Sequence, residues 1–208
     1  MWIFSRLSSL LALKSFGIHV AVTNSHADKI LESEPLIYFA NHGSWFDQVA
    51  LCVALPRSLA FLSHEKYFRT FPLSIAMRLY GHIPIKPKAD AEKKIKEGEA
   101  IRQVLREGRA VVVFPEGTRT EREEKQLRTF RKGIFALAAQ ERVRMVPVHI
   151  IGAKDIYPRK SPLLQVQRGT ISVVVGAPLP ITPSLWTEEA QDIEANFKQT
   201  YQSLVTDI

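Results

Sequence analysis

The sequence is poor in the residues that crosslink proteins or bind metals. Its 208 residues include a single cysteine, Cys52, which excludes a framework of disulfide bonds and suits a reducing compartment. It contains no Cys-x-x-Cys or His-Glu-x-x-His motif, so we expect no bound metal. It also contains no Gly-x-Gly-x-x-Gly motif and no Walker lysine, so we expect no nucleotide cofactor.

A hydrophobic run long enough to cross a membrane is also missing from the N-terminal region. Arg6 and Lys14 interrupt it, and a transmembrane helix needs ~20 apolar residues. At helical spacing, apolar side chains share one face and serines share another: Ile3, Phe4, Leu7, Leu10, Leu11 and Ile18 against Ser5, Ser8 and Ser15. We therefore predict an amphipathic helix over residues 1–22 that binds the membrane surface. A helix packed on the domain and a signal peptide are the alternatives.

The overall composition is that of a globular protein with an excess of positive charge. Hydrophobic residues make up 46% of the chain and charged residues 24%, which fits one domain over residues 1–208. The net charge of +7 suits phosphates, anionic lipids or nucleic acid. Because no basic stripe interleaved with aromatic residues and no helix-turn-helix pattern appears, we expect no nucleic-acid partner.

Strand and helix patterns alternate along the chain. The alternation predicts an α/β fold, with a mixed, largely parallel sheet flanked by helices. We expect strands at residues 35–40, 57–63, 111–114, 145–151 and 170–176, and helices at 45–55, 65–80 (broken at Pro72), 89–106, 130–140 and 184–204. Residues 152–168 are expected to form a loop, 36–176 to form the motif-bearing core, and 184–204 to close the domain.

A histidine and a carboxylate stand close together where the first predicted strand ends. His42 and Asp47 follow residues 35–40 and flank the start of the helix at 45–55. Imidazole exchanges a proton near neutral pH, and a carboxylate beside it can fix its tautomer. Since five helical steps would separate the side chains by about 140°, they can meet only if His42 lies in the loop and Asp47 in the first turn. Ser44 and Asp47 also have the spacing of a capping box, which is compatible with this arrangement.

A second motif follows the predicted strand at residues 111–114. After Pro115 the chain continues with four residues that suit an anion: Glu116, Gly117, Thr118 and Arg119. Glycine permits close approach of the backbone, threonine donates and accepts hydrogen bonds, and arginine presents a planar fork that matches phosphate. The segment predicts a phosphate-binding loop, although a turn with a solvated arginine has the same composition.

Together the two segments resemble the glycerolipid acyltransferase family, which includes the 1-acylglycerol-3-phosphate acyltransferases. Asn41-His42-x4-Asp47 is followed, about 70 residues later, by the run Phe-Pro-Glu-Gly-Thr-Arg at 114–119. Arg-Lys-Gly at 131–133 and Val-Pro-Val at 146–148 are similar to later blocks of the family. Motifs in this order are specific to the family and do not define its substrate.

The resemblance implies that an acyl group passes from acyl-coenzyme A or acyl carrier protein to the free hydroxyl of 1-acyl-sn-glycerol 3-phosphate. The product would be phosphatidic acid, a phospholipid precursor. It further implies that His42 is the general base, that Asp47 orients it, and that residues 116–119 bind the acceptor phosphate. No acyl-enzyme and no cofactor besides the acyl donor are expected. The protein would act at the cytoplasmic face of a membrane, as a peripheral or monotopic enzyme.

The middle of the chain departs from the family pattern. The family usually has a lysine near the position of His64 and an arginine near that of Pro87, whereas the nearby cations here are Lys66, Lys86 and Lys88. We predict that Lys86 binds substrate, although lysine lacks the bidentate fork of arginine. Glycerol 3-phosphate and other lysolipids therefore stay open as acceptors. Thioester hydrolysis and lipid binding without catalysis are the alternative functions.

Overall fold

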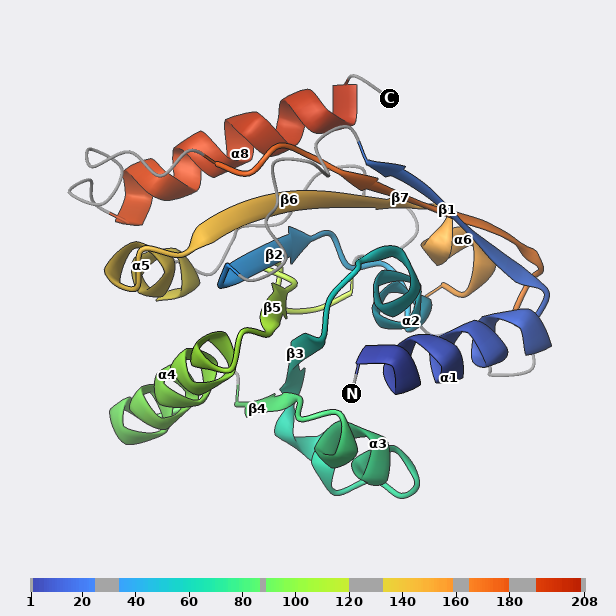
Figure 1. The fold of residues 1–208 in the computed structure, drawn as a ribbon, viewed down its shortest axis with the longest axis horizontal. Coiled ribbons are helices and arrows are strands. Elements are labelled where there is room, and N and C mark those ends of the chain that lie inside the picture. Colours follow the sequence, from blue (N-terminus) through green and yellow to red (C-terminus); the bar gives the residue numbers. More distant parts are fainter. Residues whose placement is uncertain are drawn as a thin grey trace.

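One mixed sheet organises the protein. The computed structural model describes residues 2–24, 34–86, 89–119, 133–158, 165–179 and 190–206. Within these ranges seven strands form a single sheet in the order β1-β7-β6-β2-β5-β3-β4 (Figure 1). Only β6 and β7 pair antiparallel among the described strands, which confirms the predicted, largely parallel α/β fold. The strands are β1 (Ile18–Asn24), β2 (Leu36–Ala40), β3 (Leu59–His64), β4 (Ile83–Ile85), β5 (Ala110–Val113), β6 (Arg144–Ile151) and β7 (Gly169–Val175).

Helices cover both faces of the sheet. They are α1 (Trp2–Ser15), α2 (Phe46–Ala54), α3 (Leu73–Leu79), α4 (Ala91–Arg106), α5 (Gly133–Gln140), α6 (Ala153–Ile156) and α8 (Ala190–Thr206), together with a short 3-10 helix, η2 (Glu65–Phe68). Successive side chains of a strand point to opposite faces. In β2, Tyr38 packs in the core layer of α1, α2 and α6, whereas Ile37 and Phe39 pack with α4, α5 and α8. Burial on both faces explains why the central strands are continuously apolar.

The N-terminal helix is shorter than predicted. The expectation of one helix over residues 1–22 is wrong beyond Ser15, because Ile18–Asn24 forms β1. Gly17 has a φ of +68°, a left-handed conformation that ends helices. The β-branched residues that follow suit a strand better than a helix. Because β1 pairs with β7, the folded core includes residues before the predicted start at 36.

The remaining elements agree with the predictions except in three places. The predicted break at Pro72 is present, since η2 and α3 lie on either side of it. Residues 152–168 do not form a simple loop, because α6 begins directly after Gly152. The strand β4 was not predicted, and the closing helix extends to Thr206, while residues 184–189 lie outside the described part.

Candidate active site

The two sequence motifs meet at one edge of the sheet. β2 and β5 are parallel neighbours, so the segments that follow them emerge side by side. His42 lies in the loop after β2, and Asp47 lies in the first turn of α2. His42 Nδ1 is 2.8 Å from Asp47 Oδ2. The arrangement is the one that the sequence spacing required.

Asp47 binds the loop as well as the histidine. The side chain is 1% exposed, and its Oδ2 also accepts hydrogen bonds from the backbone N–H groups of Gly43 (2.7 Å) and Ser44 (2.8 Å). The bond from Ser44 is one half of the predicted capping box. The other half differs from a capping box, because the Ser44 hydroxyl accepts from the Phe46 N–H (3.3 Å) instead of the Asp47 N–H. The same hydroxyl donates to the Tyr157 carbonyl (2.9 Å). One carboxylate therefore starts the helix and orients the imidazole.

Glu116 contacts the same loop. Its side chain is 7% exposed, and Oε1 accepts a hydrogen bond from the backbone N–H of His42 (3.0 Å). The residue does not line the large cavity that His42 faces. Its geometry therefore supports a role in holding the histidine, and the predicted contact between Glu116 and the acceptor phosphate has no support from its position.

Two aromatic side chains, which the sequence motifs contain but which received no predicted role, order the site. The ring of Phe114 stacks on the His42 imidazole, with centroids 4.1 Å apart and planes inclined by 17°. The guanidinium of Arg119 lies 5.0 Å from the centre of the Trp45 ring, a cation–π contact. Trp45 sits at the start of α2, so this contact is a third link between the two motifs. Both aromatic residues lie inside the quoted motifs, but only the fold reveals their partners.

A cavity of about 860 Å³ opens beside His42. One group of its lining residues is charged or polar: His64, Lys66, Lys86, Lys94, Glu97, Thr118 and Arg119. Another group is aliphatic and comes from β3, β4, β5, α4 and α5: Leu62, Ile85, Ile101, Val113, Ile134 and Leu137. Gly117 also lines the cavity, so three of the four residues predicted at 116–119 face it. The lining combines cations that suit phosphate with a surface that suits a hydrocarbon chain.

Lys86 lines the cavity but is held loosely. Its Nζ lies 4.0 Å from Glu65 Oε1, and its side chain is 42% exposed. Its backbone N–H donates to Glu97 Oε1 at 2.7 Å. Pro87 and Lys88 lie outside the described residues, as do residues 120–132, which include the predicted block at 131–132.

The alternative nucleophiles are poorly placed for an acyl-enzyme. The Ser44 hydroxyl is fully buried and bonded to a backbone carbonyl. Burial raises the pKa of the Cys52 thiol to about 11, and Cys52 packs against the hydrophobic core. Three backbone N–H groups near His42 that could stabilise an oxyanion are also engaged within the protein: those of Gly43 and Ser44 donate to Asp47, and that of Gly117 donates to the Phe114 carbonyl (2.9 Å).

Metal-binding clusters and membrane-spanning helices are both absent from the described part of the chain. No group of three or more His, Cys, Asp or Glu side chains in this part of the chain is arranged to hold a metal ion. None of the described helices has both the length and the apolar character needed to span a bilayer.

Comparison with known proteins agrees with the geometry of this site. The model of the family described as Acyltransferase matches residues 20–151, a span that contains both motifs. The chain belongs to the acyltransferase family. A solved acyltransferase, the 1-acyl-sn-glycerophosphate (LPA) acyltransferase PlsC from Thermotoga maritima, has the same fold with a TM-score of 0.78. The alignment has 18% identity and covers 99% of this chain and 78% of that one.

Curated acyltransferases of plants and algae are also similar. A 1-acyl-sn-glycerol-3-phosphate acyltransferase of Chlamydomonas reinhardtii is 33% identical over 147 residues, which are 71% of this chain and 43% of that protein. The chloroplastic enzyme LPAT1 of Arabidopsis thaliana is 30% identical over 70% of this chain and 39% of its own length. The chain thus spans less than half the length of these two relatives.

Proposed function

We propose that the protein transfers an acyl group from a thioester to the free hydroxyl of 1-acyl-sn-glycerol 3-phosphate and so forms phosphatidic acid. The observation that carries the proposal is the His42–Asp47 pair, which stands at the wall of a cavity with both cationic and aliphatic linings. Relatives named for this activity support the choice of acceptor. Coenzyme A and acyl carrier protein are both suitable donors, and no further cofactor is part of the proposal.

The His42–Asp47 pair suits general-base catalysis. A proton on Nδ1 that is donated to Asp47 leaves Nε2 as the acceptor, so His42 can take the proton of the acceptor hydroxyl. The freed oxygen attacks the thioester carbonyl carbon, a C–O bond forms, and the C–S bond breaks. The proton held by His42 then passes to the departing thiolate. Stacking on Phe114 keeps the imidazole in one orientation during both transfers.

Arg119 is the best-placed residue to bind the acceptor phosphate. It lines the cavity on the same side as Trp45, and its contact with the indole ring restricts the guanidinium. Binding the phosphate there would align the nearby hydroxyl with His42. Arg119→Ala should therefore raise KM for the acceptor by about tenfold or more, since charge-assisted hydrogen bonds contribute a few kcal/mol. Steady-state kinetics with varied acceptor measures this, and an unchanged KM would remove the assigned role.

An assay of donors against acceptors tests the function. Purified protein and an acyl donor are incubated with one acceptor at a time: lysophosphatidic acid, glycerol 3-phosphate, lysophosphatidylethanolamine, or none. Free thiol and lipid product are measured together. Thiol release that requires lysophosphatidic acid and yields phosphatidic acid supports the proposal. Release without any acceptor would make the protein a thioesterase. Activity with another acceptor alone would keep the mechanism and reject the substrate.

We also propose that the protein docks on a membrane through a surface of α1 and α3. Apolar side chains on α1 (Ile3, Phe4, Leu7, Leu11) and near α3 (Phe71, Ile75, Leu79) are 52–79% exposed, and we call this set the α1–α3 surface. A hydrogen bond of 2.9 Å between Ser8 and Tyr80 joins the two helices, which lie along the lower edge in Figure 1. The other side of α1 packs on the domain, where Leu13 is buried and the Trp2 indole donates to the Leu55 carbonyl.

The charge of this region suits anionic lipid. Residues 2–24 and 66–85 contain no Asp or Glu, and Arg6, Lys14, Arg69 and Arg78 are exposed there. Apolar side chains flanked by cations are typical of helices that lie in the interface of a membrane. Such a surface would bring the cavity to the bilayer that holds the lysolipid.

A further inference from the structure

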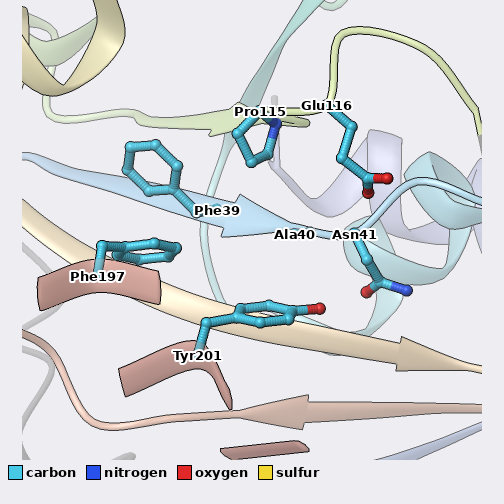
Figure 2. Close-up of a pocket in the computed structure, with 7 residues that line it drawn as sticks. All are labelled: Phe39, Ala40, Asn41, Pro115, Glu116, Phe197 and Tyr201. Atoms are coloured by element: carbon cyan, nitrogen blue, oxygen red, sulfur yellow. The ribbon is translucent and has the colours of Figure 1, made fainter. Parts of the chain in front are cut away.

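The C-terminal helix places a buried phenol directly beneath the catalytic loop. Tyr201 of α8 is 2% exposed, and it lies outside the residues 20–151 that match the acyltransferase family model. Figure 2 shows its hydroxyl pointing toward Asn41 and the side of the crevice where the Glu116 carboxylate lies. The space between these side chains is too tight for a water molecule. A buried hydroxyl without water needs protein partners.

Tyr201 hydrogen-bonds one such partner and faces a second. Its Oη is 2.7 Å from His149 Nδ1, and the hydroxyl points toward Asn41 across the crevice that both residues line. Burial, together with the negative charge of Glu116, raises the pKa of the Tyr201 phenol, and burial lowers the pKa of His149. The phenol therefore stays protonated and the imidazole stays neutral near pH 7. The bond between Tyr201 Oη and His149 Nδ1 therefore joins two neutral groups.

The backbone of the loop is held on several sides. Three consecutive backbone N–H groups donate to side chains, that of His42 to Glu116 and those of Gly43 and Ser44 to Asp47, and the Tyr201 hydroxyl points toward the preceding residue, Asn41. The Asn41 side chain also pairs with the backbone of Ile150 in both directions, at 2.8 and 2.7 Å. Segments remote in sequence, at Glu116, Ile150 and Tyr201, thus surround the backbone that carries His42.

We propose that Tyr201, held by His149, is a positioning residue that fixes the loop of His42 through Asn41. The proposal rests on the proposed function, because its kinetic effect requires an acyl transfer to measure. The C-terminal helix would then belong to the catalytic unit as well as to the core. Without the phenol hydroxyl, Asn41 loses the polar atom that points toward it, and the imidazole of the next residue, His42, is less precisely placed.

The kinetic test uses Tyr201→Phe, which removes one oxygen and keeps the ring. We expect kcat to fall about tenfold with KM for both substrates unchanged, because small misplacements of catalytic groups reduce turnover strongly. His149→Leu should have the same effect, the double variant should be no worse than either, and His149→Asn, which offers an acceptor near the Nδ1 position, should recover activity. Phe197→Leu, a change in the same core without a hydrogen bond, should lower Tm and leave kcat unchanged.

A spectroscopic test separates this proposal from the proposed function. In protein labelled with 15N-histidine, the imidazole signals of His42 are assigned by their loss in His42→Ala. They should shift or broaden in Tyr201→Phe and stay in place in Phe197→Leu. Unchanged His42 signals, or a kcat within twofold of wild type, would overturn the positioning role. If the wild type transfers no acyl group while the signals still respond to Tyr201→Phe, the proposed function fails and the positioning inference holds.

Discussion

The loop of His42 buries polar side chains, whereas the α1–α3 surface exposes apolar ones. Around His42, polar groups are withdrawn from water and bonded to one another, as with Asp47, whose Oδ2 accepts three hydrogen bonds. On the α1–α3 surface, apolar groups such as Phe4 and Phe71, 73% and 79% exposed, face outward. Buried polar groups are costly unless paired, and clustered exposed apolar groups mark a surface that contacts another phase or partner. Under the proposed function, chemistry and docking would therefore belong to two separate regions.

The largest effect on acyl transfer should come from removing the side chain of His42 or of Asp47. His42→Ala should reduce transfer by about 10³-fold, the scale of general-base catalysis, and change the free energy of unfolding by no more than about 1 kcal/mol. Asp47→Ala should abolish transfer and also destabilise the protein by about 3 kcal/mol, because the buried N–H groups of Gly43 and Ser44 lose their acceptor. Turnover assays with urea unfolding measure both. A folded His42→Ala protein with near-native turnover would reject the mechanism.

Changing the α1–α3 surface should affect docking and spare chemistry. Phe4→Glu combined with Ile75→Glu should weaken binding to anionic vesicles by about 100-fold, since each buried apolar side chain contributes about 1.5–3 kcal/mol. Turnover on lysolipid dispersed in detergent should stay unchanged. Val205→Glu, at an exposed position of α8, is the matched control. Vesicle co-sedimentation provides the measurement, and wild-type binding by the double variant would contradict the docking proposal.

The wall of the cavity offers a third, intermediate test. A Cβ added at Gly98 of α4 would make ordinary contacts with Leu137 (3.7 Å) and Arg102 (3.6 Å). Gly98→Ala should be tolerated and should stabilise the helix by about 0.5–1 kcal/mol. Gly98→Phe should fill the aliphatic part of the cavity and reduce transfer of long acyl chains about tenfold relative to short ones. Assays with donors of graded chain length decide this, and an identical preference in both variants would place the acyl chain elsewhere.

Acidification should change stability rather than chemistry or docking, through His82, which follows α3. Burial, and then the charge of Arg109, lower the pKa of His82 from 6.5 to about 4. Its Nδ1 accepts a hydrogen bond from the Phe61 N–H at 3.3 Å. Between these pH values the unfolded chain binds a proton at His82 that the folded protein excludes. The free energy of unfolding is therefore undiminished by His82 above pH 6.5 and decreases as the pH falls toward 4.

The loss from His82 should approach about 3 kcal/mol at most, at 1.36 kcal/mol per pKa unit. Unfolding in urea at several pH values measures it. His82→Gln should flatten the dependence of the unfolding free energy on pH, and His64→Asn, at a less buried position, should leave the slope unchanged. Equal slopes in wild type and His82→Gln would show that His82 is not the titrating group.

The sequence by itself determined the fold class, the family and the meeting of His42 with Asp47. Each of these depends on local pattern: apolar runs define the buried strands, and a five-residue spacing across a helix start leaves one geometry that brings the side chains together. The cation–π pair of Trp45 and Arg119 and the hydrogen bond from His42 to Glu116 were not predictable, because they join residues 74 positions apart.

Only the tertiary structure decided where the helix at the N-terminus ends and which way it faces. Helical periodicity continued through Ile18, yet pairing with β7 made that segment a strand, since the hydrogen bonds of a sheet come from residues remote in sequence. Periodicity also defined an apolar face on α1 but not whether that face packs on the core or points outward. The same holds for Tyr201 and His149, whose spacing carries no signal and whose contact exists because α8 crosses β6.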